Sequence, residues 1–208
     1  MARLSREFYL GDTVEIAQKL LGTLLVRRLD GETLVGRVTE TEAYVGRTDK
    51  ACHAYGYRRT PRTDVLFGPP GHAYLYFIYG MYHCLNFVTE PEGEPAAVLI
   101  RALEPVHGTE TVSRLRYGKA YGELTAAQRR NLLNGPGKLC RGFALTTAQN
   151  RMDLTGDELF LCTELADVGL TGPLPEGNYT VRTGKRVGID YAQEAVDFPW
   201  RFWLEAAK

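Results

Sequence analysis

Residues 23–44 read TLLVRRLDGETLVGRVTETEAY, two extended runs separated by Asp30-Gly31. Asp-Gly favours the tight two-residue turn whose twist matches that of paired antiparallel strands. The runs on either side are rich in apolar and β-branched residues, as strands are. The segment therefore predicts a β-hairpin.

A second β-hairpin is predicted at residues 74–87, YLYFIYGMYHCLNF, where Gly80 interrupts an aromatic run. Alternate side chains of a strand share a face. Tyr79 is therefore expected on the face of Phe77, opposite Tyr76, and Tyr74 is expected to pack in the core.

The remaining elements mix helices and strands. A helix is predicted at residues 12–22, begun by Asp12 or Thr13, with an apolar face of Val14, Ala17 and Leu21. The other predicted elements are a long loop at 45–71, a strand at 96–103, helices at 111–116, 125–133 and after 135, and strands at 158–162 and 178–183. Because hairpin-paired strands alternate with helices, the sequence predicts an α+β fold, one compact domain over residues 1–208 around a mostly antiparallel sheet.

Composition narrows the class of protein. The 208 residues suffice for one domain with a sizeable core. Basic and acidic residues number 25 each, so a nonspecific coat on nucleic acid is not expected, although a local basic patch is compatible with this balance. No apolar run approaches the length of a membrane span, and the first residues lack a signal-peptide core. We therefore expect no membrane association and an intracellular protein, cytoplasmic and nucleoid-associated if bacterial, or nuclear if eukaryotic.

Glu40 and Glu42 are the first candidates for chemistry. In an extended segment, residues 38, 40, 42 and 44 share one face, so both carboxylates are expected beside Val38 and Tyr44. Desolvation there would suit a carboxylate to general-base work. An exposed strand face with two solvated glutamates fits the same pattern, and the motif alone leaves both interpretations open.

Histidine and cysteine occur in two adjacent pairs, Cys52-His53 and His83-Cys84. Neighbours in an extended chain point to opposite sides, and zinc ligands are usually separated by two or more residues. We therefore predict no metal site. All four cysteines of the chain are expected to be reduced core residues, because they are widely spaced and form no CxxC pair.

Residues 135–140, GPGKLC, precede a predicted helix. Free backbone amides and Lys138 could form an anion site at that helix start. The GxxxxGK spacing of a Walker loop is absent, and a structural turn explains the same residues.

Tyr79 and Met81 flank Gly80 at the turn of the second hairpin, where side chains reach solvent. Packing in a core hairpin accounts for most aromatic residues of the run, but not for these two. An exposed aromatic ring beside a soft apolar side chain suits insertion between stacked bases.

Six motifs of the chain occur together in a recognisable order. They are TETEAY, the following loop with ACHAYG and RTPR, YLYFIYGMYHCLNF, VLIRALEP, GPGKLC and RVGI. In order and approximate spacing they resemble the alkyladenine (3-methyladenine) DNA glycosylases, a methylpurine family of mammalian type with bacterial members. The resemblance spans nearly the whole chain. It implies a curved antiparallel sheet with surrounding helices and a protruding hairpin, similar to the C-terminal domain of methionyl-tRNA formyltransferases.

The resemblance also implies catalytic roles. Glu42 matches the general base that activates the attacking water. Arg101 and the backbone carbonyl of Val187 match groups that hold this water. No lysine stands at the matched nucleophile position, so direct hydrolysis without a Schiff base is expected.

Further matched positions imply a base pocket and a DNA interface. Tyr44 and His53 would sandwich an extruded base, Tyr76 would complete the aromatic walls, and Asn86 would disfavour normal guanine by crowding its amino group. Tyr79 would take the place of the flipped nucleotide. The other expected DNA contacts are Met81 beside Tyr79, and Arg58, Thr60, Arg62 and Lys138 at the backbone.

The function implied is that of a monofunctional DNA glycosylase of base excision repair. Its expected partner is double-stranded DNA with alkylated purines, first 3-methyladenine and 7-methylguanine, with hypoxanthine or ethenoadenine as further lesions. No cofactor is expected, and a monomer would suffice. A non-catalytic nucleic-acid-binding module and a hydrolase of nucleosides or other small substrates are the alternative interpretations.

Overall fold

Strand β2 (Glu32–Val45) is the centre of the sheet. Its first half pairs with β1 (Leu24–Leu29), and its other edge pairs with β5 (Ala96–His107). Asp30 and Gly31 both have left-handed backbone angles, with φ of 49° and 84°, as the predicted tight turn requires. The first hairpin is thus confirmed.

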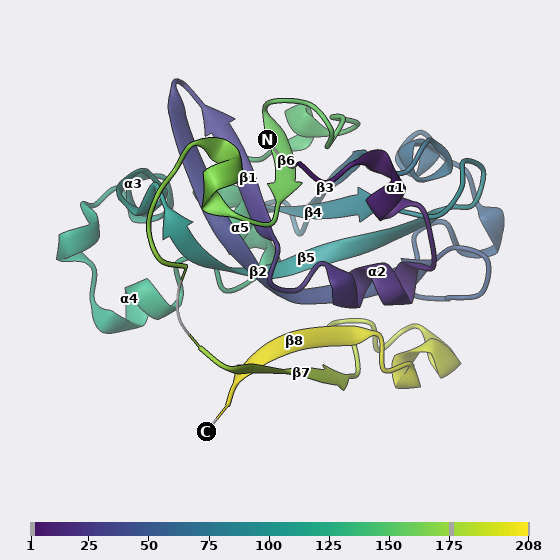
Figure 1. Ribbon diagram of the computed structural model, residues 1–208. Coiled ribbons are helices and arrows are strands. Elements are labelled where there is room, and N and C mark those ends of the chain that lie inside the picture. Colours follow the sequence, from purple (N-terminus) through teal and green to yellow (C-terminus); the bar gives the residue numbers. More distant parts are fainter. Residues whose placement is uncertain (1–2, 175–176, 208) are drawn as a thin grey trace.

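The other strands extend this sheet on both sides, and every pairing is antiparallel. The order is β3-β4-β5-β2-β1-β6, and β8 pairs with the second half of β2 and with β7. In Figure 1, β7 and β8 are the two strands drawn below β2. The bounds are β3 Ala73–Ile78, β4 Tyr82–Val88, β6 Leu159–Cys162, β7 Tyr179–Gly184 and β8 Arg201–Ala206.

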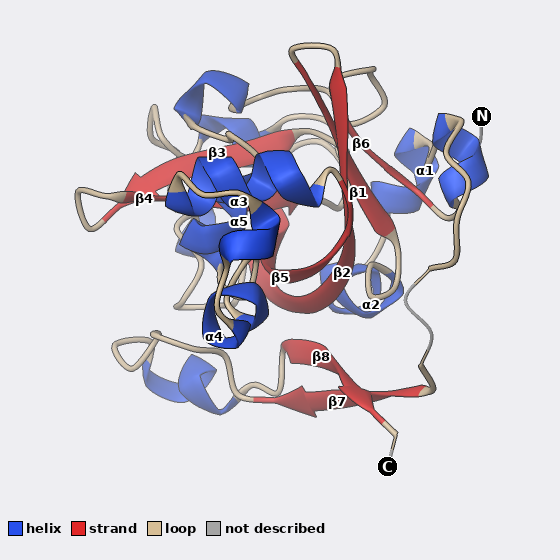
Figure 2. Ribbon diagram, turned by 90° about the vertical axis from the view of Figure 1, so that its left-hand side faces the viewer, coloured by secondary structure: helices blue, strands red, loops and turns tan. Residues whose placement is uncertain are grey.

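Short helices surround the curled sheet, which confirms the predicted α+β class (Figures 1 and 2). The α-helices are α1 Arg6–Tyr9, α2 Thr13–Lys19, α3 Thr109–Tyr117, α4 Ala126–Arg130 and α5 Pro136–Gly142. Short 3-10 turns lie at Tyr55–Tyr57, Asp64–Phe67, Tyr121–Glu123, Thr147–Gln149, Leu165–Val168 and Gln193–Asp197. This computed structural model describes residues 3–174 and 177–207, so residues 1, 2, 175, 176 and 208 of the predicted 1–208 domain lie outside the described part.

Helix starts follow their sequence signals. Asp12 caps α2 by accepting the amide hydrogens of Val14 and Glu15, and Thr125 caps α4 with a capping box. Helix α4 ends earlier than predicted, at Arg130, because the chain then turns into the core.

The apolar face predicted for α2 is offset. Its most buried residues are 13, 16, 17 and 20, which have the i, i+3, i+4, i+7 spacing of one helix face. Val14 and Leu21, which we predicted on that face, are only partly buried against the core. Ala17 is buried as predicted.

The common face predicted for residues 38–44 is interrupted. Val38 lies in the main core together with Ala43, whereas Tyr44 packs on the other side. The register between β2 and β5 shifts between Val38 and Glu40 and again between Glu40 and Thr41. Such bulges break strict alternation, so the shared face begins at Glu40.

The second hairpin, formed by β3 and β4, protrudes from the sheet as expected (Figure 2). Tyr79 and Gly80 at its turn have φ of 55° and 67°. Tyr79 is 77% exposed and Met81 is 65% exposed, which confirms the predicted exposed tip.

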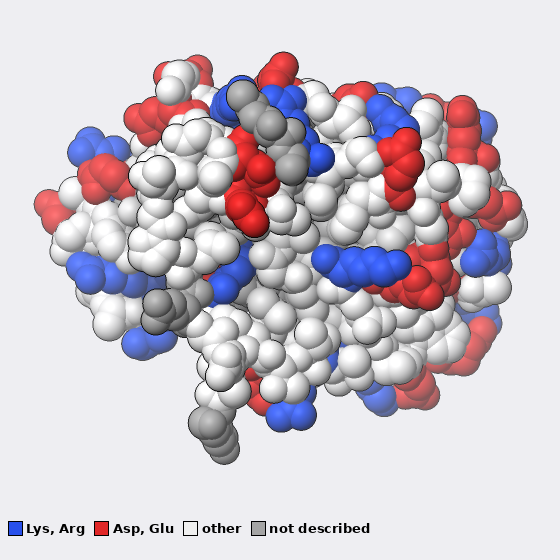
Figure 3. Space-filling model, in the orientation of Figure 1, with Lys and Arg blue, Asp and Glu red and all other residues white. Residues whose placement is uncertain are grey.

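Charges of both signs are interspersed on the surface shown in Figure 3, in keeping with the zero net charge. In the described part of the chain, no helix has both the length and the apolar character needed to cross a bilayer. All four cysteines are buried and unpaired, as predicted.

Candidate active site

A cavity of about 290 Å³ lies where the β3–β4 hairpin meets the sheet. Its size is near the lower end for small-molecule pockets, and its lining is mostly apolar and aromatic. Seven residues selected from the sequence line it, from different segments: Tyr44, His53, Tyr76, Tyr79, Asn86, Arg101 and Val187. The fold thus brings together most of the predicted site.

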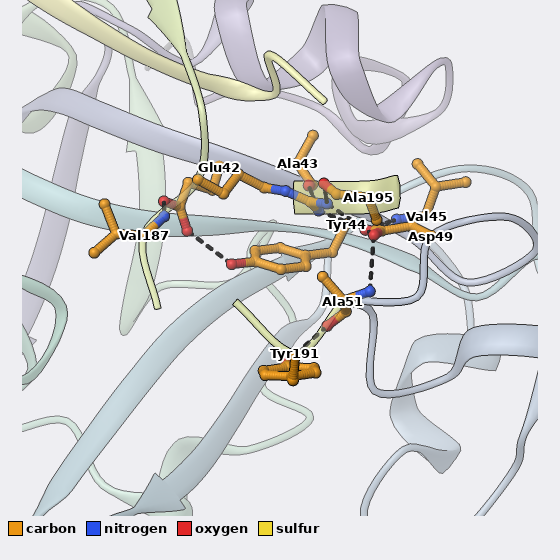
Figure 4. Close-up of polar contacts among 10 residues, drawn as sticks. Glu42, Ala43, Tyr44, Val45, Asp49, Ala51, Val187, Tyr191 and Ala195 are labelled. Carbon is orange, nitrogen blue, oxygen red and sulfur yellow. Dashed lines mark hydrogen bonds and ion pairs between the residues drawn. The ribbon is translucent and has the colours of Figure 1, made fainter. Parts of the chain in front are cut away.

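Glu42 is fully buried, and Figure 4 shows its carboxylate between Val187 and the Tyr44 hydroxyl. Its Oε1 accepts a 2.8 Å hydrogen bond from the backbone amide of Val187. Its Oε2 accepts a 2.7 Å hydrogen bond from the Tyr44 hydroxyl and lies 3.3 Å from Nη1 of Arg101. All three partners line the cavity, whereas Glu42 itself lies behind them.

The carboxylate of Glu42 retains capacity for a further hydrogen bond. Each carboxylate oxygen has about two lone-pair sites. Oε2 accepts one hydrogen bond, from Tyr44, and also pairs with the Arg101 guanidinium, whereas Oε1 accepts one, from Val187. Oε1 therefore has a lone-pair site left for one further donor.

Arg101 bridges the two glutamates of the TETEAY motif. Its Nε donates to Oε1 of Glu40 at 2.9 Å, and its Nη1 reaches Glu42. Burial lowers the pKa of Arg101, but Glu42 and Glu40 outweigh it and hold the pKa above its usual value. Arg201 also donates to Glu40, at 2.6 Å. The two carboxylates are thus paired with cations, which excludes the exposed-face interpretation of the motif.

Aromatic rings form the walls of the cavity. His53 and Tyr76 meet edge to face with 4.8 Å between ring centroids, and Tyr74 lies 5.2 Å from Tyr76. Nδ1 of His53 lies 2.9 Å from the Tyr74 hydroxyl. Tyr74, expected only to pack, therefore also lines the cavity, because its buried hydroxyl is held there by His53.

The wall residues keep defined protonation states. Burial, and then Arg62, lower the pKa of His53 to about 4, so its ring is neutral near pH 7. Burial, and then Glu42, raise the pKa of Tyr44 well above its usual value. The Tyr44 hydroxyl is therefore a permanent donor toward Glu42.

Asn86 is buried and its amide group is fixed. Its Nδ2 donates to the backbone carbonyls of Tyr74 at 3.0 Å and Cys84 at 3.4 Å. Because both amide hydrogens have acceptors, the side-chain carbonyl is the group left for the cavity.

Tyr79 lines the mouth of the cavity, with Tyr76 rather than with Phe77. The predicted alternation fails here because the left-handed backbone of Tyr79 ends the strand pattern. Met81, beyond Gly80, does not line this cavity. Tyr191 also lines the cavity, is 67% exposed and was missed from the sequence. Its position two residues after RVGI is a signal that could have found it.

The residues expected at the DNA backbone lie outside the cavity. Arg58 and Arg62 are exposed, whereas the Thr60 hydroxyl is engaged with Thr63 at 3.0 Å. Lys138 donates to Oδ1 of Asn131 at 2.8 Å. It lies in α5, two residues after the cavity-lining Pro136.

A buried ion pair supports the site and was missed from the sequence. Arg186 and Asp49 are both fully buried, and Nη2 of Arg186 donates to Oδ1 of Asp49 at 2.8 Å (Figure 4). The Arg186 guanidinium also lies 4.7 Å from the centre of the Tyr44 ring. Only the adjacency of Arg186 to Val187 in RVGI could have indicated it.

Within residues 3–174 and 177–207, no three His, Cys, Asp or Glu side chains are placed to hold a metal ion. The adjacent His-Cys pairs do not converge. His53 belongs to the cavity wall, and His83 packs on Phe77 at 4.9 Å between ring centroids.

Known proteins resemble this chain over its full extent. Residues 7–208 match the family described as methylpurine-DNA glycosylase. A protein of Clostridium acetobutylicum is 48% identical over 209 residues, which cover 99% of this chain and 96% of that protein. A Bacillus cereus protein is 50% identical over 198 residues, covering 95% and 93%. Both carry the name "Putative 3-methyladenine DNA glycosylase".

These similarities place the protein among the DNA glycosylases, hydrolases of DNA repair that act on a DNA substrate. Within that class, the chain belongs to the methylpurine-DNA glycosylase family. The family expected from the six motifs is thereby confirmed.

Proposed function

We propose that this enzyme extrudes alkylated purines from duplex DNA and hydrolyses their N-glycosidic bond with a water activated by Glu42. The observation that carries the proposal is the buried Glu42 carboxylate, held by Val187, Tyr44 and Arg101 directly behind an aromatic cavity. A cavity of about 290 Å³ suits a single planar base better than a stretch of polymer.

Extrusion has to offset the loss of stacking in the duplex. Unstacking a base costs a few kcal/mol, and less for a damaged or poorly paired base. Stacking on an aromatic side chain contributes about 1–3 kcal/mol per base, which the walls formed by Tyr44, His53 and Tyr76 can supply. Tyr79, exposed at the mouth, would occupy the gap left in the duplex, with Met81 beside it.

Hydrolysis then needs an oriented water near the sugar carbon. Glu42 would deprotonate this water, and Arg101 and the Val187 carbonyl would help to hold it. The negative charge of Glu42 would also stabilise an oxocarbenium-like transition state. Purines alkylated at N3 or N7 are already cationic and leave readily, so 3-methyladenine and 7-methylguanine are the first substrates proposed. Hypoxanthine and ethenoadenine, which are neutral, are the second.

Other residues would select and hold the substrate. Asn86, fixed by its two amide hydrogen bonds, would crowd the amino group of normal guanine. Arg58, Arg62 and Lys138 would contact the phosphate backbone, with Thr60 beside them. One chain supplies the whole cavity, so a monomer would suffice. The named relatives are bacterial, and a bacterial source would place the enzyme with the nucleoid in the cytoplasm.

The test is release of free base from methylated duplex DNA, measured by chromatography. The proposal expects release of 3-methyladenine and 7-methylguanine from duplex DNA. It expects no release of 7-methylguanine from the free nucleoside 7-methylguanosine. Release from the free nucleoside alone would favour a nucleoside hydrolase. Tight binding of damaged duplex without any release would favour a non-catalytic binding module.

A further inference from the structure

Two aromatic wall residues of the cavity each have an arginine guanidinium close to their ring. The guanidinium carbon of Arg186 lies 4.7 Å from the centre of the Tyr44 ring, and that of Arg62 lies 4.7 Å from the centre of the Tyr76 ring. Neither arginine lines the cavity itself. Each of these two wall rings therefore has a guanidinium close to it that belongs to a residue outside the lining.

The two arginines differ in how their charge is compensated. Arg186 is fully buried against the carboxylate of Asp49, which neutralises it. Arg62 is exposed, and in the described part of the chain no carboxylate pairs with it. Asp64, an acidic residue of the same loop, is taken by Arg59 and Arg151. Arg62 therefore carries a positive charge beside the Tyr76 wall that no carboxylate in the described part of the protein neutralises.

The charge of Arg62 reaches the residues around the cavity. Its Nη2 lies 3.5 Å from Nε2 of His53. Burial first, and Arg62 second, lower the pKa of His53, which means that a positive charge on this wall is disfavoured. A cationic base that contacts His53 and Tyr76 would experience the same field.

We propose that Arg62 sets the balance between cationic and neutral bases, by disfavouring a positively charged purine against Tyr76. A cation binds the negative face of an aromatic ring, and a guanidinium already 4.7 Å from the centre of the Tyr76 ring weakens that attraction. Like charges this close also repel. A neutral purine is spared both effects. The inference rests on the proposed function, which supplies the bound base.

The test compares Arg62→Gln with the wild type under single-turnover conditions at saturating enzyme, so that differences in DNA affinity do not enter the rate. The substrates are two duplexes of the same sequence, one with 7-methylguanine and one with hypoxanthine. Arg62→Gln is expected to excise 7-methylguanine about threefold faster or more, with no gain on hypoxanthine.

Two control variants distinguish the effect of a charge at the Tyr76 ring on the excision rate from the effect of a charge at the DNA backbone. Arg62→Lys keeps the charge and should excise 7-methylguanine more slowly than Arg62→Gln does. Arg58→Gln removes one positive charge from the same loop, away from Tyr76, and should not speed 7-methylguanine excision. No gain in Arg62→Gln, or an equal gain on both lesions, would overturn the inference.

A second measurement does not depend on catalysis. An NMR titration should show the pKa of His53 higher in Arg62→Gln than in the wild type, and unchanged in Arg58→Gln. An unchanged His53 titration in Arg62→Gln would contradict the inference. If the wild type released no damaged base, the proposed function would fail. The titration would still decide whether the charge of Arg62 lowers the pKa of His53 in the cavity wall.

Discussion

The fully buried Arg186 and Asp49 side chains join three separate segments around the active site. Arg186 also donates to the backbone carbonyls of Ala43 at 2.7 Å and Ala195 at 3.1 Å. Ala43 lies between Glu42 and Tyr44, and Val187, which follows Arg186, donates its amide to Glu42. The ion pair therefore sets the position of the Glu42 carboxylate.

Removal of one partner of this pair should destabilise the fold. Asp49→Ala leaves the Arg186 guanidinium buried and uncompensated, so the free energy of unfolding should fall by about 3–5 kcal/mol in urea denaturation. Asp197→Ala is the control, because its pair with Lys185 is exposed and should contribute less than about 1 kcal/mol. An equally small loss in Asp49→Ala would refute the supporting role.

Tyr79→Ala should lose most of the affinity for damaged duplex, because no aromatic ring would fill the gap left by the extruded nucleotide. Fluorescence anisotropy with a labelled lesion duplex measures this loss. Tyr57→Ala is a matched control, since Tyr57 is also exposed and has a similar φ, 61° against 55° for Tyr79. Equal affinities of the two variants would exclude Tyr79 as the wedge.

His53 should make stability depend on pH. Its pKa is about 4 in the folded protein against 6.5 ordinarily, so the unfolded chain binds more protons between these values. The contribution of His53 to the free energy of unfolding should therefore be fully present above about pH 6.5. As the pH is lowered, the free energy of unfolding should fall by at most about 3 kcal/mol and level off below about pH 4. Urea denaturation at pH 7 and 4.5 should show a smaller fall in His53→Gln. Identical pH dependence in both proteins would contradict the neutral His53.

Borohydride should trap no covalent adduct between the enzyme and a damaged duplex. Trapping requires a Schiff base from a lysine, and no lysine is among the described residues that line the cavity. Electrophoresis under denaturing conditions measures the adduct, with a lysine-dependent glycosylase as the positive control. A robust adduct would show that direct hydrolysis is wrong.

Local signals predicted much of the fold. The Asp30-Gly31 turn, the Asp12 cap and the Thr125 capping box each specify geometry through neighbouring residues, and all are present. Strand β8 was not predicted, because its pairing with β2 depends on residues about 160 positions away (for example Thr41 with Phe202). The burial of Val38 was misplaced for a similar reason, since the bulge in β2 is set by the register of β5.

The site was predictable where a residue has its own chemistry. Glu42 could be selected by type and by motif, whereas Arg101 and Tyr76 were selected only through the resemblance to the family. All three lie at or beside the cavity. The Arg186–Asp49 pair was not found, since each residue alone resembles a surface charge. The contact of the Arg62 guanidinium with the Tyr76 ring likewise depends on how the 45–71 loop folds back on the hairpin.

The most direct measurement is release of 3-methyladenine from methylated duplex DNA by Glu42→Gln. This variant keeps the shape of the side chain but removes the base that activates water. It should bind damaged duplex as tightly as the wild type and release no base, while the control Glu205→Gln, altered in an exposed pair, should release base at the wild-type rate. Full release by Glu42→Gln would contradict the assignment of Glu42 as the general base.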